Sequence, residues 1–248
     1  EVVAEMIREK IRGIVSDPDT AETLCPKDHP FGTKRPCLDT NYYATYNLPH
    51  VRLVYLRKTP ISTVTETNIE FGDESVEFDA IVYATGFDAM TGAIVSVDIT
   101  GKDGVTLKKK WEFGPHNYLG LTTVGFPNLF MIHGPESPGV LFNMPLGAEM
   151  ESDWIRDCIL HLRAQGKGAI EPAPGVDAAY GAEVAEFARM TLFEQTESWY
   201  TGANIPGKHR QFAVHVAGPL YFEKIREVAA QGYSGFVMEP AATATDAA

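Results

Sequence analysis

Two adjacent basic side chains, Lys34 and Arg35, stand in a short loop that could bind an anion. Gly32 precedes them and Pro36 follows them, and proline fixes the backbone at that end of the turn. Together with Lys27 they concentrate positive charge in a chain whose formal net charge is −12. A basic loop is usually solvated surface, so two interpretations stay open: a solvated loop, or a rigid turn that faces an anion.

A second candidate site lies where an apolar run ends at Thr85 and Gly86. The run, residues 80–84, follows Asp79, is rich in strand formers and lacks polar alternation, a pattern typical of a strand buried on both faces in a parallel sheet. Small residues at its end let a ligand approach, and ligands of open α/β sheets bind beyond the carboxyl ends of strands. A plain turn at Gly86 is the alternative.

A third candidate is the loop that begins at residues 133–135, His-Gly-Pro. The apolar run at 128–132 predicts a strand before it, and the amphipathic pattern from about 147 to 162 predicts a long helix after it. Asn143 and Met144 stand just ahead of that helix. A helix N-terminus favours partial negative charge on a ligand.

Other periodic segments predict the elements that surround these loops. Helical spacing of apolar residues predicts further helices at about 2–15, 178–195 and 221–230, and Asp17-Pro18-Asp19 is expected to end the first of them. Strand-like patterns predict a strand at 51–56 and hairpin-like pairs at 61–65 with 68–71 and at 93–99 with 105–111.

Length and composition bound the class of protein. The 248 residues suffice for one large domain or two small ones, and 44% hydrophobic with 22% charged residues is ordinary for a globular protein. The acidic net charge argues against general binding to nucleic acid or anionic membranes. No apolar run approaches the ~20 residues of a membrane span. We therefore expect neither nucleic acid nor a membrane as partner.

The cysteines and histidines give little support for a metal site. Cys25, Cys37 and Cys158 are widely spaced and form no CxxC pair, and the seven histidines form no HxxxH or HExxH arrangement. We expect these cysteines, together with His29, His133 and His161, to be packing or surface residues of a cytoplasmic protein. The chain begins at Glu1, already inside a helical pattern, so we expect further residues upstream.

Four stretches, in this order, carry a resemblance to a known family: HPFGTKRPCLDTNYYATYN, FDAIVYATGFDAMTG, GFPNLFMIHGPESP and ESWYTGANIPGK. The chain closely resembles the type I Baeyer–Villiger monooxygenases of the flavin-containing monooxygenase superfamily, over roughly residues 1–238. Family members are about twice as long, and their first half carries GxGxxG fingerprints for FAD and NADPH. No GxGxxG occurs here, so the chain resembles the C-terminal half only.

The resemblance implies an α/β fold, the C-terminal portion of a Rossmann-like flavoprotein with two dinucleotide-binding domains, hairpins and long covering helices. It predicts a helical segment and loop at residues 1–33, the end of the NADP-binding domain at 34–78 and the end of the FAD-binding domain at 79–238. Residues 239–248 have the composition of a disordered tail.

The resemblance also implies a reaction. Family members use FAD, NADPH and O2 to insert one oxygen atom beside a ketone carbonyl, through a flavin C4a-peroxide, and release an ester or lactone. The flavin carries this chemistry, while the protein supplies positioning and electrostatics. The resemblance assigns Arg35 to stabilise the anionic peroxide and to contact the nicotinamide cofactor, a role that suits a planar, permanently charged guanidinium.

The remaining site residues follow from the same resemblance. Lys34 matches a lysine near the 2′-phosphate of NADP, and Thr85 with Gly86 would pass beneath the cofactors. Asn143 and Met144 would present backbone amides to the pyrimidine edge of the flavin.

Two further residues are assigned less directly. Leu141, together with Met144, would line the substrate pocket. Trp199 matches a tryptophan that contacts NADP, although a tryptophan among glycines and prolines is also often a core plug.

Two other functions stay open. A related flavin monooxygenase could oxidise an amine nitrogen or a sulfide sulfur, although the KRP loop and the ESWYTGANIPGK stretch favour ketone oxidation. Alternatively, the chain could be a non-autonomous half that needs a separate or missing N-terminal chain to bind FAD and NADP. A large apolar face left bare where that half packs would be its signature.

Overall fold

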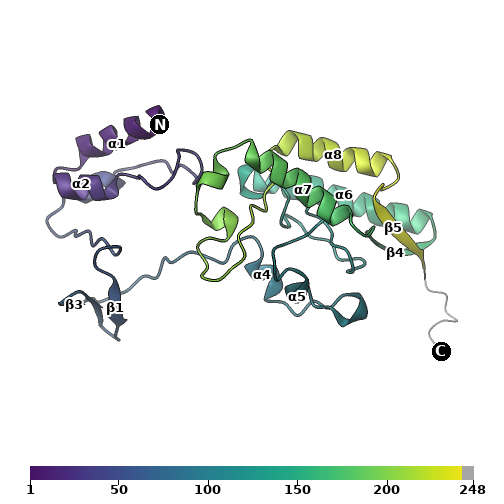
Figure 1. Cartoon of the computed structure of the whole chain (residues 1–248), viewed down its shortest axis with the longest axis horizontal. Helices are drawn as coiled ribbons and strands as arrows, with labels where there is room; N and C mark the ends of the chain where they lie inside the picture. Colours follow the sequence, from purple (N-terminus) through teal and green to yellow (C-terminus); the bar gives the residue numbers. More distant parts are fainter. Residues whose placement is uncertain (242–248) are drawn as a thin grey trace. The chain divides into compact units, whose positions relative to one another are not determined.

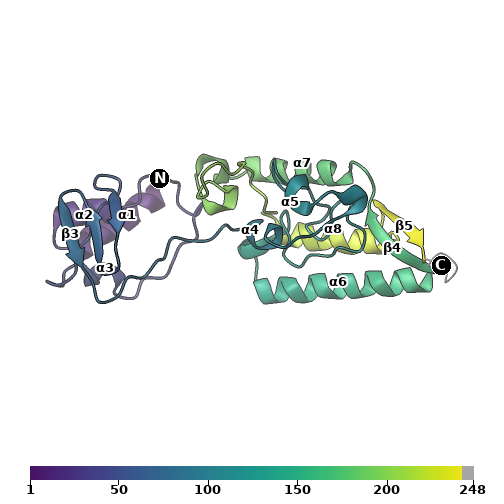
Figure 2. The ribbon, with the colours of Figure 1, turned by 90° about the horizontal axis from the view of Figure 1, so that it is seen from below.

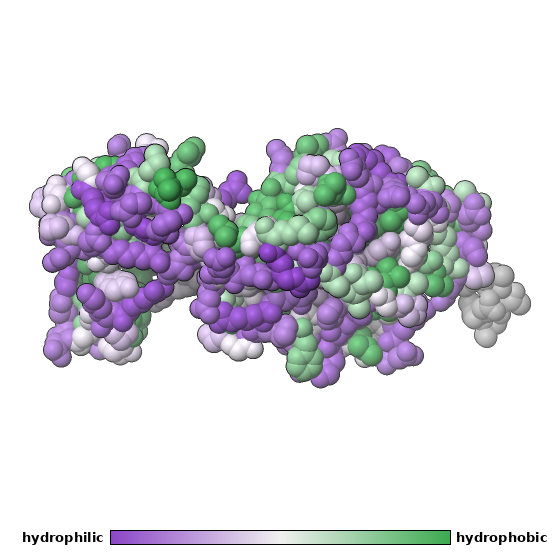
Figure 3. All heavy atoms as spheres, turned by 45° about the horizontal axis from the view of Figure 1, so that its top comes forward, coloured by the Kyte–Doolittle hydropathy of each residue, from purple (hydrophilic) through white to green (hydrophobic). Residues whose placement is uncertain are grey.

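The computed structural model describes residues 1–241 and divides into two compact units, Glu1–Gly86 and Phe87 onward. Figure 1 shows the elements of each unit. Among the described residues, no helix combines the length and apolarity needed to cross a bilayer. In Figure 3 the visible face of each unit mixes hydrophilic with hydrophobic surface. The predicted domain limits at residues 33/34 and 78/79 stay predictions.

The helical part of the first unit consists of α1 (Val2–Ile14), α2 (Pro18–Leu24) and the short α3 (Tyr42–Thr45). Ile11 of α1 packs with Ala21 and Cys25 in a small core. The expectation that Asp17-Pro18-Asp19 only ends a helix was incomplete. Asp17 caps α2, because its Oδ2 accepts the Thr20 N–H at 2.8 Å, and Pro18 suits the first helical turn, where no N–H is needed.

A three-stranded antiparallel sheet completes the first unit, with β1 (Ile61–Val64), β2 (Asn68–Phe71) and β3 (Glu74–Glu77) in the order β1-β2-β3. The predicted hairpin at 61–65 and 68–71 is therefore confirmed. The strand predicted at 51–56 is wrong. The chain turns there, with the Lys58 N–H donating to the Tyr55 carbonyl at 2.9 Å.

The predicted buried strand at 80–84 is also wrong. Residues 80–88 have neither helix nor strand, and Val82 and Tyr83 are 87% and 68% exposed. A parallel strand needs neighbours to pair its backbone groups and cover its side chains. None of the described strands pairs with this segment. The composition of the run suits a buried strand, but the sheet that would bury it is not among the described residues.

The second unit is built on three long helices, α6 (Met144–Ala164), α7 (Val176–Arg189) and α8 (Gly218–Ala230). Helix α6 packs against α8 and against β4 (Lys167–Pro172), which pairs antiparallel with β5 (Phe236–Pro240); Figure 2 shows these elements side by side. Their buried faces form the main core, which includes Leu119, Trp154, Cys158, Tyr180, Val184, Tyr221, Phe222 and Ile225.

The three helices predicted at about 147–162, 178–195 and 221–230 are confirmed, although the second ends earlier. Helix α7 stops at Arg189, and a separate 3₁₀ turn, η3, spans Phe193–Gln195. Of the tail predicted at 239–248, the first two residues belong to β5, and residues 242–248 lie outside the described residues.

Short turns replace two strand predictions in this unit. The segments at 93–99 and 105–111 form α4 (Gly92–Val95), η1 (Lys102–Gly104) and α5 (Leu107–Lys110), with a single β-bridge from Thr100 to Thr106. The run at 128–132 forms no strand; Asn128 lies in a turn with a φ of 59°, and residues 129–132 are irregular. A small core, which includes Leu107 and Met131, explains the apolar residues of these segments.

Candidate functional site

The loop that carries Lys34 and Arg35 is a built turn in the first unit. Gly32 has a φ of +87°, a conformation that suits glycine. The next residue, Thr33, is buried and bonds the Pro30 carbonyl through both its backbone N–H, at 3.3 Å, and its Oγ1, at 2.7 Å. This geometry favours the rigid-turn interpretation over a loose solvated loop.

The Asp28 carboxylate lies near three basic side chains of this unit. Its Oδ1 is 2.7 Å from His29 Nδ1, and its Oδ2 is 2.9 Å from a guanidinium nitrogen of Arg57. Lys34 Nζ lies 3.8 Å from the same Oδ2. The hydrogen bond from His29, followed by Arg57 and Lys34, lowers the pKa of Asp28 to about 2. The carboxylate is therefore charged wherever the protein is folded near neutral pH.

The other predicted residues of the first unit lie at its surface. Arg35 is exposed, and so are Thr85 and Gly86 in the irregular segment after β3. Gly86 has a φ of +88°, and a Cβ there would meet no atom within 4 Å. The backbone conformation thus explains the glycine, while the surface around it leaves room for another group to approach.

In the second unit, Asn143 and Met144 form the N-terminus of α6. Asn143 is the N-cap, and its Oδ1 accepts the Leu146 N–H at 3.1 Å. Pro145 occupies the first turn of the helix, where a missing N–H is tolerated. The predicted substrate residue Leu141 ends the 3₁₀ turn η2 (Gly139–Leu141) and is 37% exposed. Asn143, Met144 and Leu141 therefore share one loop end.

Trp199 lies in another part of the second unit, in the 3₁₀ turn η4 (Trp199–Thr201). Its ring stacks on Tyr200 at a centroid distance of 3.9 Å, and Tyr200 is buried. Trp199 itself is only partly buried, so it covers the core with one face and keeps part of its surface exposed.

The segment that follows Trp199 binds the chain just beyond Gly86. Asn204 Nδ2 donates to the Phe87 carbonyl at 2.9 Å. Lys208 forms an ion pair with Asp88 and donates to the Ala89 carbonyl at 3.1 Å. Two of the four motif stretches, ATGFD and ESWYTGANIPGK, are thus joined by side-chain bonds.

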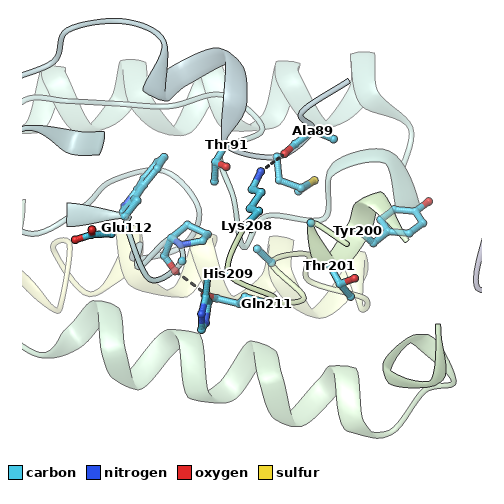
Figure 4. A pocket seen from close by; sticks show the side chains of 14 residues that line it. Ala89, Thr91, Glu112, Tyr200, Thr201, Lys208, His209 and Gln211 are labelled. Atoms are coloured by element: carbon cyan, nitrogen blue, oxygen red, sulfur yellow. Dashed lines mark hydrogen bonds between the residues drawn. The ribbon is translucent and has the colours of Figure 1, made fainter. Parts of the chain in front are cut away.

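A small cavity of about 50 Å³ lies beside these bonds. In Figure 4, Lys208 extends toward Ala89 and Thr91, while His209 and Gln211 line another part of the wall. Among the described residues, no group of three or more His, Cys, Asp or Glu side chains could hold a metal ion.

Sequence reasoning missed two buried acids in this unit, Glu136 and Glu151, which are both fully buried. Burial raises the pKa of Glu136 to about 8 and also raises the pKa of Glu151. A signal existed for Glu151, which shares the buried stripe of α6 with Trp154 and Cys158. No periodic pattern marks Glu136, because it lies in a loop.

Several known proteins are similar to this chain over nearly its whole length. No family model matches the chain. Among curated proteins, it is 41% identical over 241 residues to acetone monooxygenase (methyl acetate-forming) of Gordonia sp. (strain TY-5), covering 96% of this chain and 45% of the relative. It is 39% identical to cyclopentanone 1,2-monooxygenase of Comamonas sp. over 95% of this chain and 44% of the relative. The corresponding values for phenazine N-monooxygenase of Lysobacter antibioticus are 38%, 96% and 44%.

Solved structures give the same result. A steroid monooxygenase bound to NADP superposes with a TM-score of 0.88 at 44% identity, over 97% of this chain and 45% of that one. A closed crystal structure of cyclohexanone monooxygenase gives a TM-score of 0.91 at 40% identity, over 96% and 44%. These likenesses confirm the predicted α/β fold.

All of these relatives are monooxygenases. The chain belongs to the Baeyer–Villiger monooxygenase family, as its four motif stretches predicted. It spans about 45% of the length of the curated relatives it matches.

Proposed function

We propose that this chain is the C-terminal portion of an FAD- and NADPH-dependent Baeyer–Villiger monooxygenase that inserts one oxygen atom of O2 beside a ketone carbonyl. The observation that carries the proposal is 41% identity over 96% of the chain to an acetone monooxygenase that forms methyl acetate. Its three free cysteines agree with a reducing compartment, which we propose to be the cytoplasm.

Bound FAD would supply the activation of O2, and the residues at the start of α6 suit its binding. Because Asn143 caps the helix and Pro145 fixes the first turn, the backbone of this turn is held before any ligand arrives. The positive end of the helix dipole lies here and favours an electron-rich edge of a flavin. We assign Asn143 and Met144 to that edge.

Lys34 and Trp199 each suit a part of NADPH. Lys34 offers a half-exposed ammonium group on a rigid turn, and its charge suits the 2′-phosphate that distinguishes NADP from NAD. Trp199 offers a partly exposed indole whose N–H can donate one hydrogen bond. We also assign Thr85 and Gly86 to the cofactor surface, because small residues there leave its backbone open to approach.

Arg35 holds a permanent charge, and we assign it to stabilise the anionic oxygen nucleophile that attacks the ketone. A guanidinium suits this role because its planar fork donates several hydrogen bonds without losing its proton. Removing such a preorganised donor costs about 3 kcal/mol or more of barrier. Leu141 and Met144 would cover the apolar part of the ketone.

The chain needs a partner half for this activity. Val82 and Tyr83 belong to an apolar run yet are largely exposed, as expected for a strand whose sheet lies on another polypeptide segment. The relatives are more than twice as long as the matched region, which is consistent with such a half. We propose that this half binds the adenosine parts of FAD and NADPH.

A second candidate reaction is oxidation of an amine nitrogen. It is favoured by the phenazine N-monooxygenase, which is 38% identical over 96% of the chain. The same cofactors serve both reactions, so the substrate decides between them.

The test is to purify this chain alone and together with the N-terminal half of the acetone monooxygenase relative. We expect flavin absorbance and NADPH-dependent ester formation from a small ketone in the complex only. The same complex is also given an amine and a thioether in separate reactions, and formation of the N-oxide or sulfoxide there without any ester from the ketone would favour the second candidate. In the complex, Arg35→Ala should abolish the ester while NADPH still bleaches the flavin, and ester formation by this variant would contradict the role of Arg35.

A further inference from the structure

Two side chains, the partly buried His133 and the fully buried Glu151, face each other directly behind the N-terminus of α6. Glu151 lies on the second turn of the helix and is fully buried. Gly147 lies one turn before it, and a Cβ on this glycine would come within 2.8 Å of the His133 ring. A side chain at 147 would therefore displace the imidazole. The ring occupies a recess that the helix sequence leaves open for it.

The imidazole connects the loop to the first turn of the helix. His133 Nε2 lies 2.8 Å from the Met144 carbonyl oxygen. A carbonyl only accepts hydrogen bonds, so Nε2 carries the proton and donates it. Nδ1 lies 3.6 Å from Glu151 Oε2 and is buried without a hydrogen-bond partner among the described residues. The ring thus holds the Met144 carbonyl while its other nitrogen faces the acid.

Glu151 in turn holds the loop and α8. Its Oε2 accepts the backbone N–H of His133 at 2.7 Å, and its Oε1 lies 3.0 Å from the Tyr221 hydroxyl. That hydroxyl is also 2.9 Å from the Leu119 carbonyl oxygen. A hydroxyl has one proton, and Leu119 offers only an acceptor. Both contacts are satisfied when Tyr221 donates to Leu119 and a protonated Glu151 donates to Tyr221.

We propose that His133 and Glu151 are positioning residues, a charge-neutral clamp that fixes the first turn of α6 and thereby orients Asn143 and Met144 toward the flavin. The inference rests on the proposed function for the identity of the ligand, and on the contacts alone for the clamp. A bond to the Met144 carbonyl restricts the rotation of that residue. The cap at Asn143 then holds the same turn from its other end.

The clamp requires Glu151 to be a neutral carboxylic acid. A buried carboxylate facing two acceptors and no full cation would be costly, whereas a carboxylic acid can donate to Tyr221 and still accept from the His133 N–H. Glutamine has the same shape and also offers a donor and an acceptor. Glu151→Gln is therefore the conservative variant, and Glu151→Leu is the disruptive one.

Hydrogen–deuterium exchange of the chain itself tests the clamp. His133→Leu removes the donor, whereas His133→Gln keeps a side-chain N–H that can reach the Met144 carbonyl. In His133→Leu and Glu151→Leu, exchange of the Leu146 and Gly147 amides should rise about tenfold, the factor that corresponds to one lost hydrogen bond. The glutamine variants should stay near wild type, as should the amides of residues 155–164 in all variants.

Three outcomes would overturn the proposal. In the first, exchange at the first turn of α6 stays unchanged in His133→Leu. In the second, exchange rises equally along the whole of α6. In the third, Glu151→Gln raises exchange as much as Glu151→Leu does. The last outcome would show that a charged carboxylate is needed. Because no cofactor takes part, these outcomes do not depend on the proposed function.

FAD titration of the complex with the N-terminal half tests the link to the cofactor. His133→Leu should weaken FAD binding about tenfold, and His133→Gln should restore it. His161→Leu, at the other end of α6, serves as the control and should bind FAD like wild type. Equal binding by His133→Leu and wild type would overturn the orienting role. Absence of FAD binding by the wild-type complex would instead overturn the proposed function.

Discussion

Lys34 shares the carboxylate of Asp28 with Arg57, and the two distances differ. Arg57 lies 2.9 Å from Oδ2, whereas Lys34 Nζ lies 3.8 Å from it. Side chains exposed to this extent form pairs worth about 1 kcal/mol or less. Lys34 can therefore leave Asp28 at little cost and meet the 2′-phosphate of NADP, which carries about −1.5 to −2 charges.

We predict that Lys34→Ala lowers the preference for NADPH over NADH about tenfold or more, since a charged hydrogen bond contributes roughly 1.5–3 kcal/mol. Asp28→Asn should tighten NADPH binding a fewfold, because it removes the competing charge. The measurement is titration of the complex with each coenzyme. Lys58→Ala, which removes a cation near the Tyr55 ring, is the control. An unchanged preference in Lys34→Ala would refute the assignment.

The sequence located this loop but not its internal pairing. Adjacent Lys34 and Arg35 between a glycine and a proline offered a rigid turn as one of two interpretations, beside a solvated loop. One partner of Asp28, however, is Arg57, which stands 29 residues later. Spacing along one chain reveals side chains that share a turn or a helix face, and it reveals nothing about a pair that only the fold brings together.

At the scale of elements, the helices were predictable and several strands were not. The stripe of α6, with Gly147, Glu151, Trp154, Cys158 and Leu162 buried, repeats at helical spacing and can be read from the sequence. The apolar run at 80–84 carries no such period, and its state depends on which strands lie beside it. The run at 128–132 likewise packs in a core without forming a strand.

The loop between residues 133 and 143 depends on the second buried acid, Glu136. Its Oε2 accepts the Asn117 N–H at 2.8 Å, and its carbonyl accepts the Tyr180 hydroxyl at 3.1 Å. A Cβ on Gly181 of α7 would lie 2.9 Å from Oε1, so the helix leaves space for this carboxyl group. Glu136 thereby joins the loop to α7 and to the segment at Asn117.

Burial raises the pKa of Glu136 from 4.5 to about 8, so the folded state holds its proton more tightly than the unfolded state. The resulting stability is complete below pH 4.5 and disappears as the pH rises through about 8. Each pH unit between these values should lower the free energy of unfolding by up to about 1.4 kcal/mol. Glu136→Gln, which cannot ionise, should remove this slope.

Urea unfolding of the chain at pH 5 and pH 8, followed by a probe in the second unit such as Trp154, measures the effect. Glu149→Gln is the matched control, because this glutamate is exposed on α6 and should leave the slope unchanged. A slope that persists in Glu136→Gln would assign the pH dependence to another group and contradict the neutral state of Glu136.

At the scale of the whole molecule, exposed apolar side chains lie on both sides of Gly86, the last residue of the first unit. The first unit ends in the exposed segment with Val82 and Tyr83, and the second begins at Phe87, which is 87% exposed. Among the hydrogen bonds of the described residues, Phe87 takes part in one, in which its backbone carbonyl accepts from Asn204. Large apolar side chains on both sides of Gly86 therefore remain in contact with solvent.

An exposed apolar segment with unpaired backbone groups can pair as a strand with another strand. Covering a valine side chain contributes about 1.5–3 kcal/mol, so a charge at position 82 should weaken docking of the N-terminal half by a factor of about ten or more. We predict that Val82→Asp lowers its affinity by this factor. The free chain should unfold at the same urea concentration as wild type, because Val82 contacts little of its own unit.

Val2→Asp is the matched control, since Val2 is 77% exposed on α1 and a docking strand does not need it. Binding of the labelled N-terminal half, measured by fluorescence anisotropy, separates the two variants. If both variants bind as tightly as wild type, the segment at 80–88 is not the docking strand. If both weaken equally, added negative charge on an already acidic chain is the cause. Only a loss confined to Val82→Asp places the missing strand beside the ATG stretch.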